Sequence, residues 1–207
     1  STTPGSNLVY DFTFLYQSGK PHAPSQIGGW TYSYDANGNT VQKAQGEDIT
    51  EYFWNEENRL LRAEINGEST DFAYDANGNR TVKGGPQGET LYVSEFYQIH
   101  NRDTVTKHIF VGPTRVASQL SRYSDPNLYD TGYERSHTYT YHPDHLGSSN
   151  IITDSAGNMF QQIEYMPYGE TWLDEGTDLN VIGYKFTGKE LDTETGLYYY
   201  GARYLDP

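Results

Sequence analysis

Cysteine is absent from this 207-residue chain, which excludes disulfide bonds and thiol catalysis. No stretch approaches the roughly 18 consecutive apolar residues that a membrane-spanning helix needs, so we expect no membrane span. Positive charge is scarce, since 14 Lys and Arg stand against 28 Asp and Glu. The net charge of −14 argues against a nucleic-acid partner. No signal peptide is recognisable at the start, which resembles an internal boundary, so export is not excluded.

The chain is instead rich in aromatic residues and glycine. The chain holds 20 Tyr and 21 Gly but only two Met. No run of a dozen or more residues carries a helical apolar stripe. A composition rich in Tyr and Gly, broken into short segments, is typical of β structure. We therefore predict an all-β fold.

A hexad repeat is the most informative pattern. Tyr-Asp-Ala-Asn-Gly-Asn occurs at residues 34–39 and again at 74–79, and a degenerate copy, Trp-Asn-Glu-Glu-Asn-Arg, occupies 54–59. The aromatic positions therefore recur every 20 residues, which indicates a stacked array of like units. The repeat and turn positions are Tyr34, Asp35, Asn37, Gly38, Asn39, Trp54, Asn58, Tyr74, Asp75, Asn77, Gly78 and Asn79.

Each repeat unit reads as one hairpin. Residues 30–34 alternate aromatic with small polar side chains, which predicts a strand with one aromatic face. Asn37-Gly38 predicts a tight turn with positive φ at both central positions, and Asp35 is expected to accept backbone N–H groups there. A lone hairpin is marginal in water, so the units are expected to pair edge to edge. The predicted architecture is a curved strip of antiparallel hairpins.

The rest of the chain divides by pattern. Residues 1–27 form an N-terminal segment with a strand at Leu8–Tyr16, and residues 28–136 form the hairpin array. Two or three strands are expected within 89–120, including Thr104–Val111. An exposed loop is expected near 121–136, where Pro, Gly and polar residues gather. Longer, distinctive motifs run from residue 137 to 207.

Several groups of residues raise the question of chemistry. The alternating oxygens of Asp35, Asn37 and Asn39 suggest a calcium loop, but the glycine and the glutamate fall in the wrong places, which favours turn chemistry. His142, Asp144 and His145 could ligate zinc, although their spacing on a strand and turn favours a hydrogen-bonded turn. We therefore expect no metal and no cofactor.

Acidic, aromatic and hydroxyl groups were weighed in the same way. A glycosidase needs two carboxylates at a set separation. Glu190, Asp192 and Glu194 alternate on one predicted strand face, as do Asp174 and Asp178 near Trp172, but solvated strand faces are the simpler interpretation. Tyr198, Tyr199, Tyr200 and Tyr204 favour sheet packing over a lining for cargo or glycan. Ser148 and Ser149 lack a nucleophile elbow, and Asn79-Arg80-Thr81 fits a glycosylation acceptor only by a common pattern.

The motifs after residue 137, in their order and spacing, resemble the core region of Rhs (YD-repeat) proteins. They include Tyr-His-Pro-Asp-His-Leu-Gly-Ser at 141–148, Tyr-Met-Pro-Tyr-Gly-Glu at 165–170 and Gly-Leu-Tyr-Tyr-Tyr-Gly-Ala-Arg-Tyr-Leu-Asp-Pro at 196–207. The hexads belong to the same family, so the resemblance covers roughly residues 28–83 and 137–207. The core-motif residues are Asp144, His145, Leu146, Gly147, Ser148, Tyr165, Pro167, Gly169, Gly188, Gly196, Leu197, Tyr199, Arg203, Tyr204, Asp206 and Pro207.

The resemblance implies a structural role. In such proteins the YD repeats form a β-strip that spirals into a hollow shell, and the shell encloses a variable C-terminal toxin or is displayed at a surface. Relatives include cocoon components of insecticidal toxin complexes, contact-dependent bacterial effectors and animal teneurins. The implied location is secreted or on the cell surface of a bacterium. The implied partners are the rest of the parent chain or another β subunit at the open strand edges, a toxin cargo, or further copies of the chain.

One departure limits what the resemblance carries over. In many bacterial members, segments that follow the equivalent of residues 203–207 hold an aspartyl self-cleavage site, and this sequence stops at Pro207. We therefore predict no catalytic residue here and a non-catalytic scaffold or shell segment. The open alternatives are a surface-exposed module that binds glycan or protein, a self-assembling structural element and an independent enzyme.

Overall fold

The computed structural model describes residues 12–17, 21–122, 131–178 and 183–207. The chain divides into two compact units, whose described parts lie within residues 12–87 and 88–207, and we call them the N-terminal and C-terminal units. The all-β prediction is confirmed, because the helices among the described residues are the short α1 (Thr131–Ser136) and η1 (Phe186–Gly188). In each unit the strands lie in their sheet in the order of the chain.

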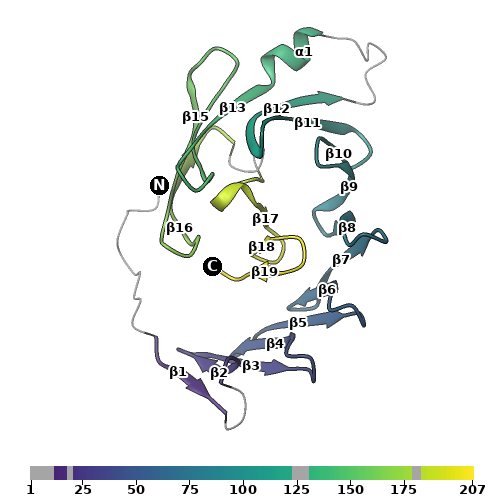
Figure 1. The fold of residues 1–207 in the computed structure, drawn as a ribbon, viewed down its shortest axis with the longest axis vertical. Coiled ribbons are helices and arrows are strands. Elements are labelled where there is room, and N and C mark those ends of the chain that lie inside the picture. The colour runs from purple at the N-terminus through teal and green to yellow at the C-terminus, as the bar shows by residue number, and fades with distance from the viewer. Residues whose placement is uncertain (1–11, 18–20, 123–130, 179–182) are drawn as a thin grey trace. The chain divides into compact units, whose positions relative to one another are not determined.

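The N-terminal unit is a run of antiparallel hairpins (Figure 1). Each strand from β2 to β7 pairs with the one before it and the one after it, as edge-to-edge pairing of hairpins requires. Its strands are β1 (Phe14–Tyr16), β2 (Pro24–Ile27), β3 (Trp30–Tyr34), β4 (Thr40–Gln45), β5 (Asp48–Trp54), β6 (Leu60–Ile65), β7 (Glu68–Tyr74) and β8 (Arg80–Gly85).

The turns of the hexads are not the tight turns that we predicted. Gly38 has φ +90°, but Asn37 keeps a negative φ, so only one residue of the Asn-Gly pair enters the left-handed region. The N–H of Gly38 donates to the Asp35 carbonyl at 3.3 Å, and the pairing register shifts between Ser33 and Tyr34. This pattern is a type I turn that ends in a bulge, a longer hairpin connection than the two-residue loop.

The two-residue turn with positive φ at both positions does occur, at Asn66-Gly67. These residues have φ +50° and +88°, and they join Ile65 directly to its partner Glu68. The loop has only two residues, so the strand twist selects this turn type. The degenerate hexad also has one residue with positive φ at this position, because Asn58 has φ +59° where the other two copies have glycine. Asn tolerates this conformation better than other side chains.

Burial alternates along these strands as predicted. Tyr52 on β5 and Ala63 on β6 are direct partners, and both are buried, as is Phe72 on β7. Phe53, which points to the other face, is 45% exposed. Period-2 alternation therefore separates a buried aromatic face from an exposed one.

The C-terminal unit continues the same principle with a second run of antiparallel strands and adds a small second sheet. Its larger sheet runs in chain order from β9 to β16, and β17, β18 and β19 form the small sheet. The strands are β9 (Gly88–Ser94), β10 (Tyr97–His100), β11 (Thr104–Val111), β12 (Thr114–Arg122), β13 (Thr138–Pro143), β14 (Ser149–Thr153), β15 (Met159–Tyr165), β16 (Thr171–Gly176), β17 (Glu190–Asp192), β18 (Leu197–Tyr199) and β19 (Tyr204–Leu205).

The core of the C-terminal unit lies on one face of the larger sheet. Tyr139 and Tyr141 on β13 pack with Ile152 on β14 and Ile163 on β15. Both isoleucines are fully buried, and Phe160 contacts Tyr139 with a ring separation of 4.5 Å. Cross-strand aromatic and β-branched pairs of this kind are the main stabilising unit of a sheet.

Three segment predictions differ from the structure. The region expected as a loop near 121–136 contains the end of β12 and the helix α1, while residues 123–130 lie outside the described residues. Glu134 of α1 accepts hydrogen bonds from Lys107 and Ser121, both at 2.5 Å, so this helix is held against the sheet. The strand predicted at Leu8–Tyr16 is described only from residue 12, and there it covers Phe14–Tyr16. Four strands, not two or three, occupy 88–122.

Candidate functional site

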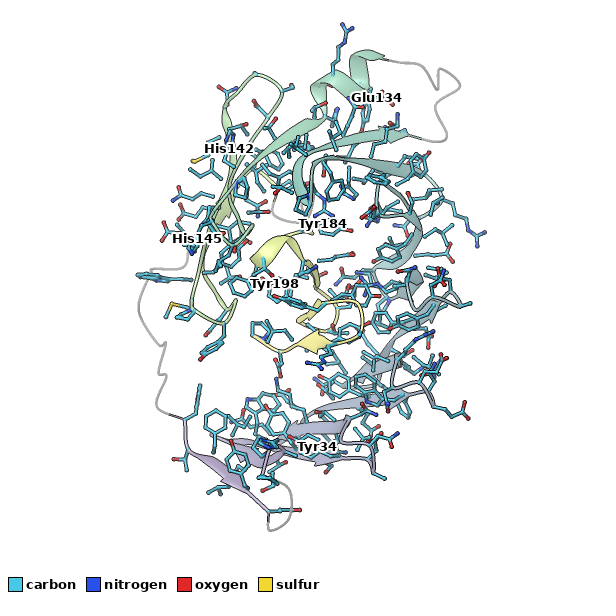
Figure 2. All side chains as sticks on the ribbon, in the orientation of Figure 1. Tyr34, Glu134, His142, His145, Tyr184 and Tyr198 are labelled. Carbon is cyan, nitrogen blue, oxygen red and sulfur yellow. The ribbon has the colours of Figure 1, made fainter. Side chains whose placement is uncertain are left out.

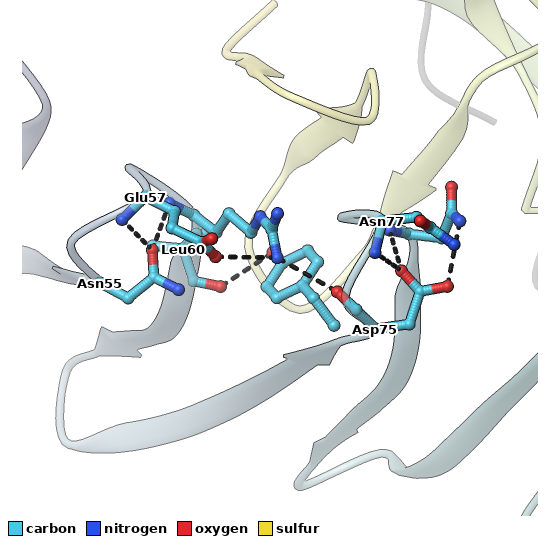
Figure 3. Close-up of polar contacts among 8 residues, drawn as sticks. Asn55, Glu57, Leu60, Asp75 and Asn77 are labelled. Carbon is cyan, nitrogen blue, oxygen red and sulfur yellow. Dashed lines mark hydrogen bonds and ion pairs between the residues drawn. The ribbon is translucent and has the colours of Figure 1, made fainter.

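The carboxylate of Asp75 organises its own turn. Its Oδ1 accepts the backbone N–H of Asn77 at 2.8 Å and of Asn79 at 2.9 Å, and its Oδ2 accepts the Asn79 amide at 3.1 Å (Figure 3). The side-chain bond from Asn79, followed by the backbone bonds, lowers the pKa of Asp75 below its usual value. The predicted role of the hexad aspartate as a backbone acceptor is confirmed. Asn55 accepts two N–H groups in the same way in the middle copy.

Neighbouring turns of the N-terminal unit are tied to one another. The Asn58 side-chain oxygen accepts the amide of Asn37 at 3.0 Å and that of Asn39 at 2.8 Å. The Arg59 guanidinium donates to the Asp75 carbonyl at 3.2 Å and lies against Gly78 (Figure 3). The repeat therefore carries bonds along the turn edge, from one hairpin to the next.

The aromatic residue of each hexad makes a second link between hairpins. The Trp54 Nε1–H donates to the Thr40 carbonyl at 2.7 Å, and the Tyr74 hydroxyl donates to the Leu60 carbonyl at 2.8 Å. Thr40 and Leu60 are the first residues of β4 and β6, each the second strand of the preceding hairpin. Tyr34 donates to the Pro24 carbonyl at 2.8 Å. An aromatic body with one polar end suits this position, since the ring packs and the donor fixes the register.

The carboxylate of Asp35 serves as a hydrogen-bond acceptor within its own turn. Asp35 Oδ1 accepts the N–H groups of Asn37 and Asn39, and its Oδ2 accepts the Asn39 amide. Within the described residues, no group of three or more His, Asp or Glu could hold a metal ion. Asp35 and Asn39 are thus hydrogen-bonded to each other within the turn, as turn chemistry predicts.

The same turn recurs in the C-terminal unit at 144–148. Asp144 Oδ1 accepts the N–H of Leu146 at 2.8 Å and of Ser148 at 2.9 Å, and Gly147 has φ +86°. The predicted hydrogen-bonded turn is therefore present. His142 bonds Thr153, and His145 lies exposed at the turn, so the structure does not bring the two histidines together (Figure 2).

This turn receives the C-terminal segment, which we define as residues 183–207. Ser148 Oγ accepts the Thr187 N–H at 3.1 Å, and Ser149 Oγ donates to the Tyr184 carbonyl at 2.8 Å. Both serines are buried, so they act as structural hydrogen-bond partners. The turn at 166–170 also lies close to the C-terminal segment, because a Cβ on Gly169 would lie 2.6 Å from the Phe186 ring.

Charged and polar side chains fasten the C-terminal segment to the sheet. Lys185 Nζ pairs with Asp174 Oδ2 at 2.6 Å, with side chains 8% and 17% exposed, and Gln161 donates to the other oxygen at 2.6 Å. Further along, the Tyr92 hydroxyl donates to Glu190 at 2.8 Å. The segment therefore contacts strands as far apart in the sheet as β9 and β16.

The carboxylate interpretation needs correction. Glu190 and Asp192 are buried rather than solvated, and Glu194 lies beyond the end of β17 and is half-buried. Asp174 is engaged by Lys185, while Asp178 is exposed. Burial through the C-terminal segment is a tertiary effect, which a local pattern does not reveal.

The tyrosines at 198–200 and 204 pack within the small sheet and against neighbouring residues of the C-terminal unit. Tyr198 is fully buried and donates to the Gly169 carbonyl at 3.3 Å, and burial raises its pKa to about 12. Tyr199 pairs with Tyr204 across β18 and β19, with ring centroids 5.4 Å apart. Tyr200 bonds Thr187 at 2.6 Å.

The remaining core-motif residues are spread over the same segment. Tyr165 donates to the Ser149 carbonyl at 3.0 Å, and its pKa is raised by burial. Gly188 ends η1 with φ +67°, Gly196 turns β17 into β18 with φ +73°, and Leu197 is buried. Pro167 lies in the 166–170 turn, and Arg203, Asp206 and Pro207 are exposed.

Sequence reasoning missed the side chains of the sheet that grip Tyr184. The Arg115 guanidinium lies 3.3 Å from the Tyr184 ring centroid and donates to the Gly188 carbonyl at 3.3 Å. Gln98 donates to the Tyr184 hydroxyl. Gln98 and Arg115 belong to β10 and β12, in the stretch without recognisable motifs, so no local signal pointed to them.

A strand array with periodic turns and a docked C-terminal segment defines a YD-type β scaffold. The chain matches the family described as Teneurin YD-shell over residues 15–207. It belongs to this family. The Rhs (YD-repeat) resemblance is thereby confirmed.

Individual relatives agree with this assignment. The chain is 31% identical over 183 residues to the toxin subunit YenC1 of Yersinia entomophaga, covering 86% of this chain and 16% of that protein. It is 30% identical over 195 residues to the tRNA3(Ser)-specific nuclease WapA of Bacillus spizizenii, covering 88% and 8%. Teneurin-3 of Danio rerio is 26% identical over 185 residues, covering 88% and 7%. The chain thus spans a small part of each relative.

A solved structure supports the fold. The crystal structure of TcdB2-TccC3-TEV matches with a TM-score of 0.61 at 20% identity, covering 84% of this chain and 11% of that one. No helix among the described residues is long and apolar enough to cross a membrane.

Proposed function

We propose that this chain is a non-catalytic structural segment of a larger YD-shell protein, and that the shell encloses or presents a C-terminal toxin. The observation that carries the proposal is the bonding from turn to turn. Asn58 and Arg59 link successive turns, and Trp54 and Tyr74 link successive hairpins, so side chains of the repeat serve to extend a sheet. Such a design builds a wall from repeated units.

The names of the relatives support a toxin context. One is a toxin subunit and another is a nuclease, and this chain covers 16% and 8% of their lengths. We propose that the activity of such relatives resides in other parts of their chains. The net charge of −14 favours a basic cargo. Secretion or cell-surface display follows from the same context and is part of the proposal.

The proposed partners are strands that extend the array. β1 pairs with β2 alone among the described strands, and large apolar side chains near it are about half exposed. Open sheet edges recruit further strands. We propose that the rest of the parent chain, or another β subunit, covers this edge. The exposed side chains are Phe12 (53%), Phe14 (51%), Leu15 (49%) and Tyr16 (52%).

The test uses the parent protein with its natural sequence on both sides of this segment. Intact mass and size-exclusion chromatography should show a chain that cuts itself downstream of Pro207 and retains the released fragment. As a control, the same parent protein is made with a catalytically inert version of the downstream fragment, and the retention of the inert and natural fragments is compared. An uncut parent chain, or one that loses the fragment at once, would contradict the toxin-shell proposal.

A surface adhesion module is the second candidate. Tyr168 and Trp172 are 75% and 47% exposed, close together along the chain at the start of β16, and a teneurin is among the relatives. Exposed aromatic rings can bind sugar or protein. Measurable glycan binding that disappears in the Y168A/W172A double variant would favour this candidate over the shell.

A further inference from the structure

A buried histidine lies under the C-terminal segment, and the proposed scaffold role makes no use of it. His108 on β11 is 5% exposed, and its Nδ1 is hydrogen-bonded to Ser118 Oγ at 2.8 Å. Ser118 is fully buried and is hydrogen-bonded in turn to the Tyr141 hydroxyl at 2.8 Å. The other ring nitrogen of His108, Nε2, is buried without a hydrogen-bond partner among the described residues. A buried polar atom without a partner is costly and asks for an explanation.

The imidazole forms part of the grip on Tyr184. The ring of His108 meets the Tyr184 ring edge to face, with centroids 4.9 Å apart. The Arg115 guanidinium contacts the same tyrosine ring, with its central carbon 3.3 Å from the centroid. Tyr184, labelled in Figure 2, therefore contacts both the His108 imidazole and the permanently charged Arg115 guanidinium. The cation–π contact of Arg115 with Tyr184 is attractive, whereas a second, unpaired positive charge buried at His108 would be costly.

The charges that act on His108 come from two basic groups, Arg115 and His100, and the C-terminal segment contributes the Tyr184 ring. Burial, followed by the charges of Arg115 and His100, lowers the pKa of His108 to about 3. The facing titratable and charged groups are His100 on β10, Arg115 on β12, Tyr141 on β13 and Tyr184.

We propose that His108 is an acid-sensitive catch for residues 183–207: its neutral imidazole holds Tyr184 at neutral pH, and its protonation releases the segment from the sheet. When Tyr184 leaves, the buried Nε2 meets water and the proton is solvated. The inference concerns regulation of the docked segment and holds whether or not the parent protein encloses a toxin. The effector is the proton itself.

The direction of the pH effect follows from linkage. A histidine whose pKa is lower when the segment is docked stabilises docking fully above its ordinary value of 6.5 and loses that contribution as the pH falls toward 3. Opening of the segment should therefore become about tenfold more favourable per pH unit below about 6.5. Between pH 7.5 and pH 5 the expected gain is roughly 30-fold.

Hydrogen exchange on the complete chain tests the proposal. Protection factors, corrected for intrinsic exchange, should fall roughly 30-fold between pH 7.5 and 5 for the Lys185 and Leu191 amides, which donate to the Lys189 and Gly183 carbonyls. The amides of β14 and β15 should keep their protection. In His108→Gln, which can still bond Ser118 but cannot titrate, the protection of the segment should not change with pH.

The control variant is His142→Gln, since this exposed histidine bonds Thr153 away from Tyr184. It should behave as the natural chain does. Equal pH dependence in H108Q and the natural chain would overturn the proposal, as would simultaneous loss of protection in β14 and β15. If H108Q fails to fold, an NMR titration of the natural chain decides: segment release without a change in His108 protonation would refute the catch.

Discussion

Replacing Gly169 by alanine tests whether the C-terminal segment docks as closely as the structure indicates. The residue has φ +96°, which alanine adopts at a cost of about 1–2 kcal/mol. Its added Cβ would lie 2.6 Å from the Phe186 ring, whereas carbon atoms prefer roughly 3.5–4.0 Å. About 1 Å must therefore be absorbed by moving Phe186. Overpacking of this kind costs a further ~1–3 kcal/mol.

Gly157 supplies a matched control in the same kind of turn. It has φ +82°, and no atom lies within 4 Å of a Cβ built there. Gly157→Ala should thus show the backbone cost alone. Urea denaturation of both variants should give a free energy of unfolding about 1–3 kcal/mol lower for G169A than for G157A. Hydrogen exchange should place the extra loss in residues 183–207.

An equal loss of stability in the two variants would refute the reasoning. It would mean that Phe186 is not held at Gly169, and that the segment is mobile enough to step aside without cost. A larger loss in G157A would contradict the geometry of both turns. If a smaller residue in place of Phe186, as in Phe186→Leu, restored the stability of G169A, the steric explanation would be supported.

Three further outcomes are expected. Tyr74→Phe removes the hydroxyl that donates to the Leu60 carbonyl and should lower the free energy of unfolding by about 0.5–1.5 kcal/mol in urea titrations, and an unchanged midpoint would contradict the link between hairpins. Asp75 has a lowered pKa, so the stability it contributes is present above its ordinary value of 3.8 and is lost as the pH falls through the lowered one; Asp75→Asn, which cannot ionise, should lower the melting temperature at pH 7 and lessen its fall at acid pH, and an unaltered acid limb would argue against the turn bonds. Lys185→Met leaves Asp174 buried without its cation and should cost about 3–5 kcal/mol by thermal denaturation, a cost that Asp174→Leu in the same chain should largely remove.

The sequence alone determined the strands, the repeat and the function of the hexad aspartates. Alternation places aromatic residues on one face, and a short polar side chain such as Asp75 bonds its own backbone, so both features are local. These properties depend on neighbours within a few residues. The turn type was mispredicted at Asn37-Gly38 because loop length, not the dipeptide, selects the tight turn, and the two-residue spacing of Ile65 and Glu68 marked the right place.

The tertiary structure alone decided what the C-terminal segment does. Tyr184 meets His108 and Arg115, which lie more than 60 positions earlier in the chain, and burial turned Glu190 from an expected surface residue into a partner of Tyr92. No periodicity encodes such contacts, because they depend on which face of the sheet the chain returns to. Strand pairing is local between neighbouring hairpins, while docking of a distant segment is set by shape and charge that exist only after the sheet has formed.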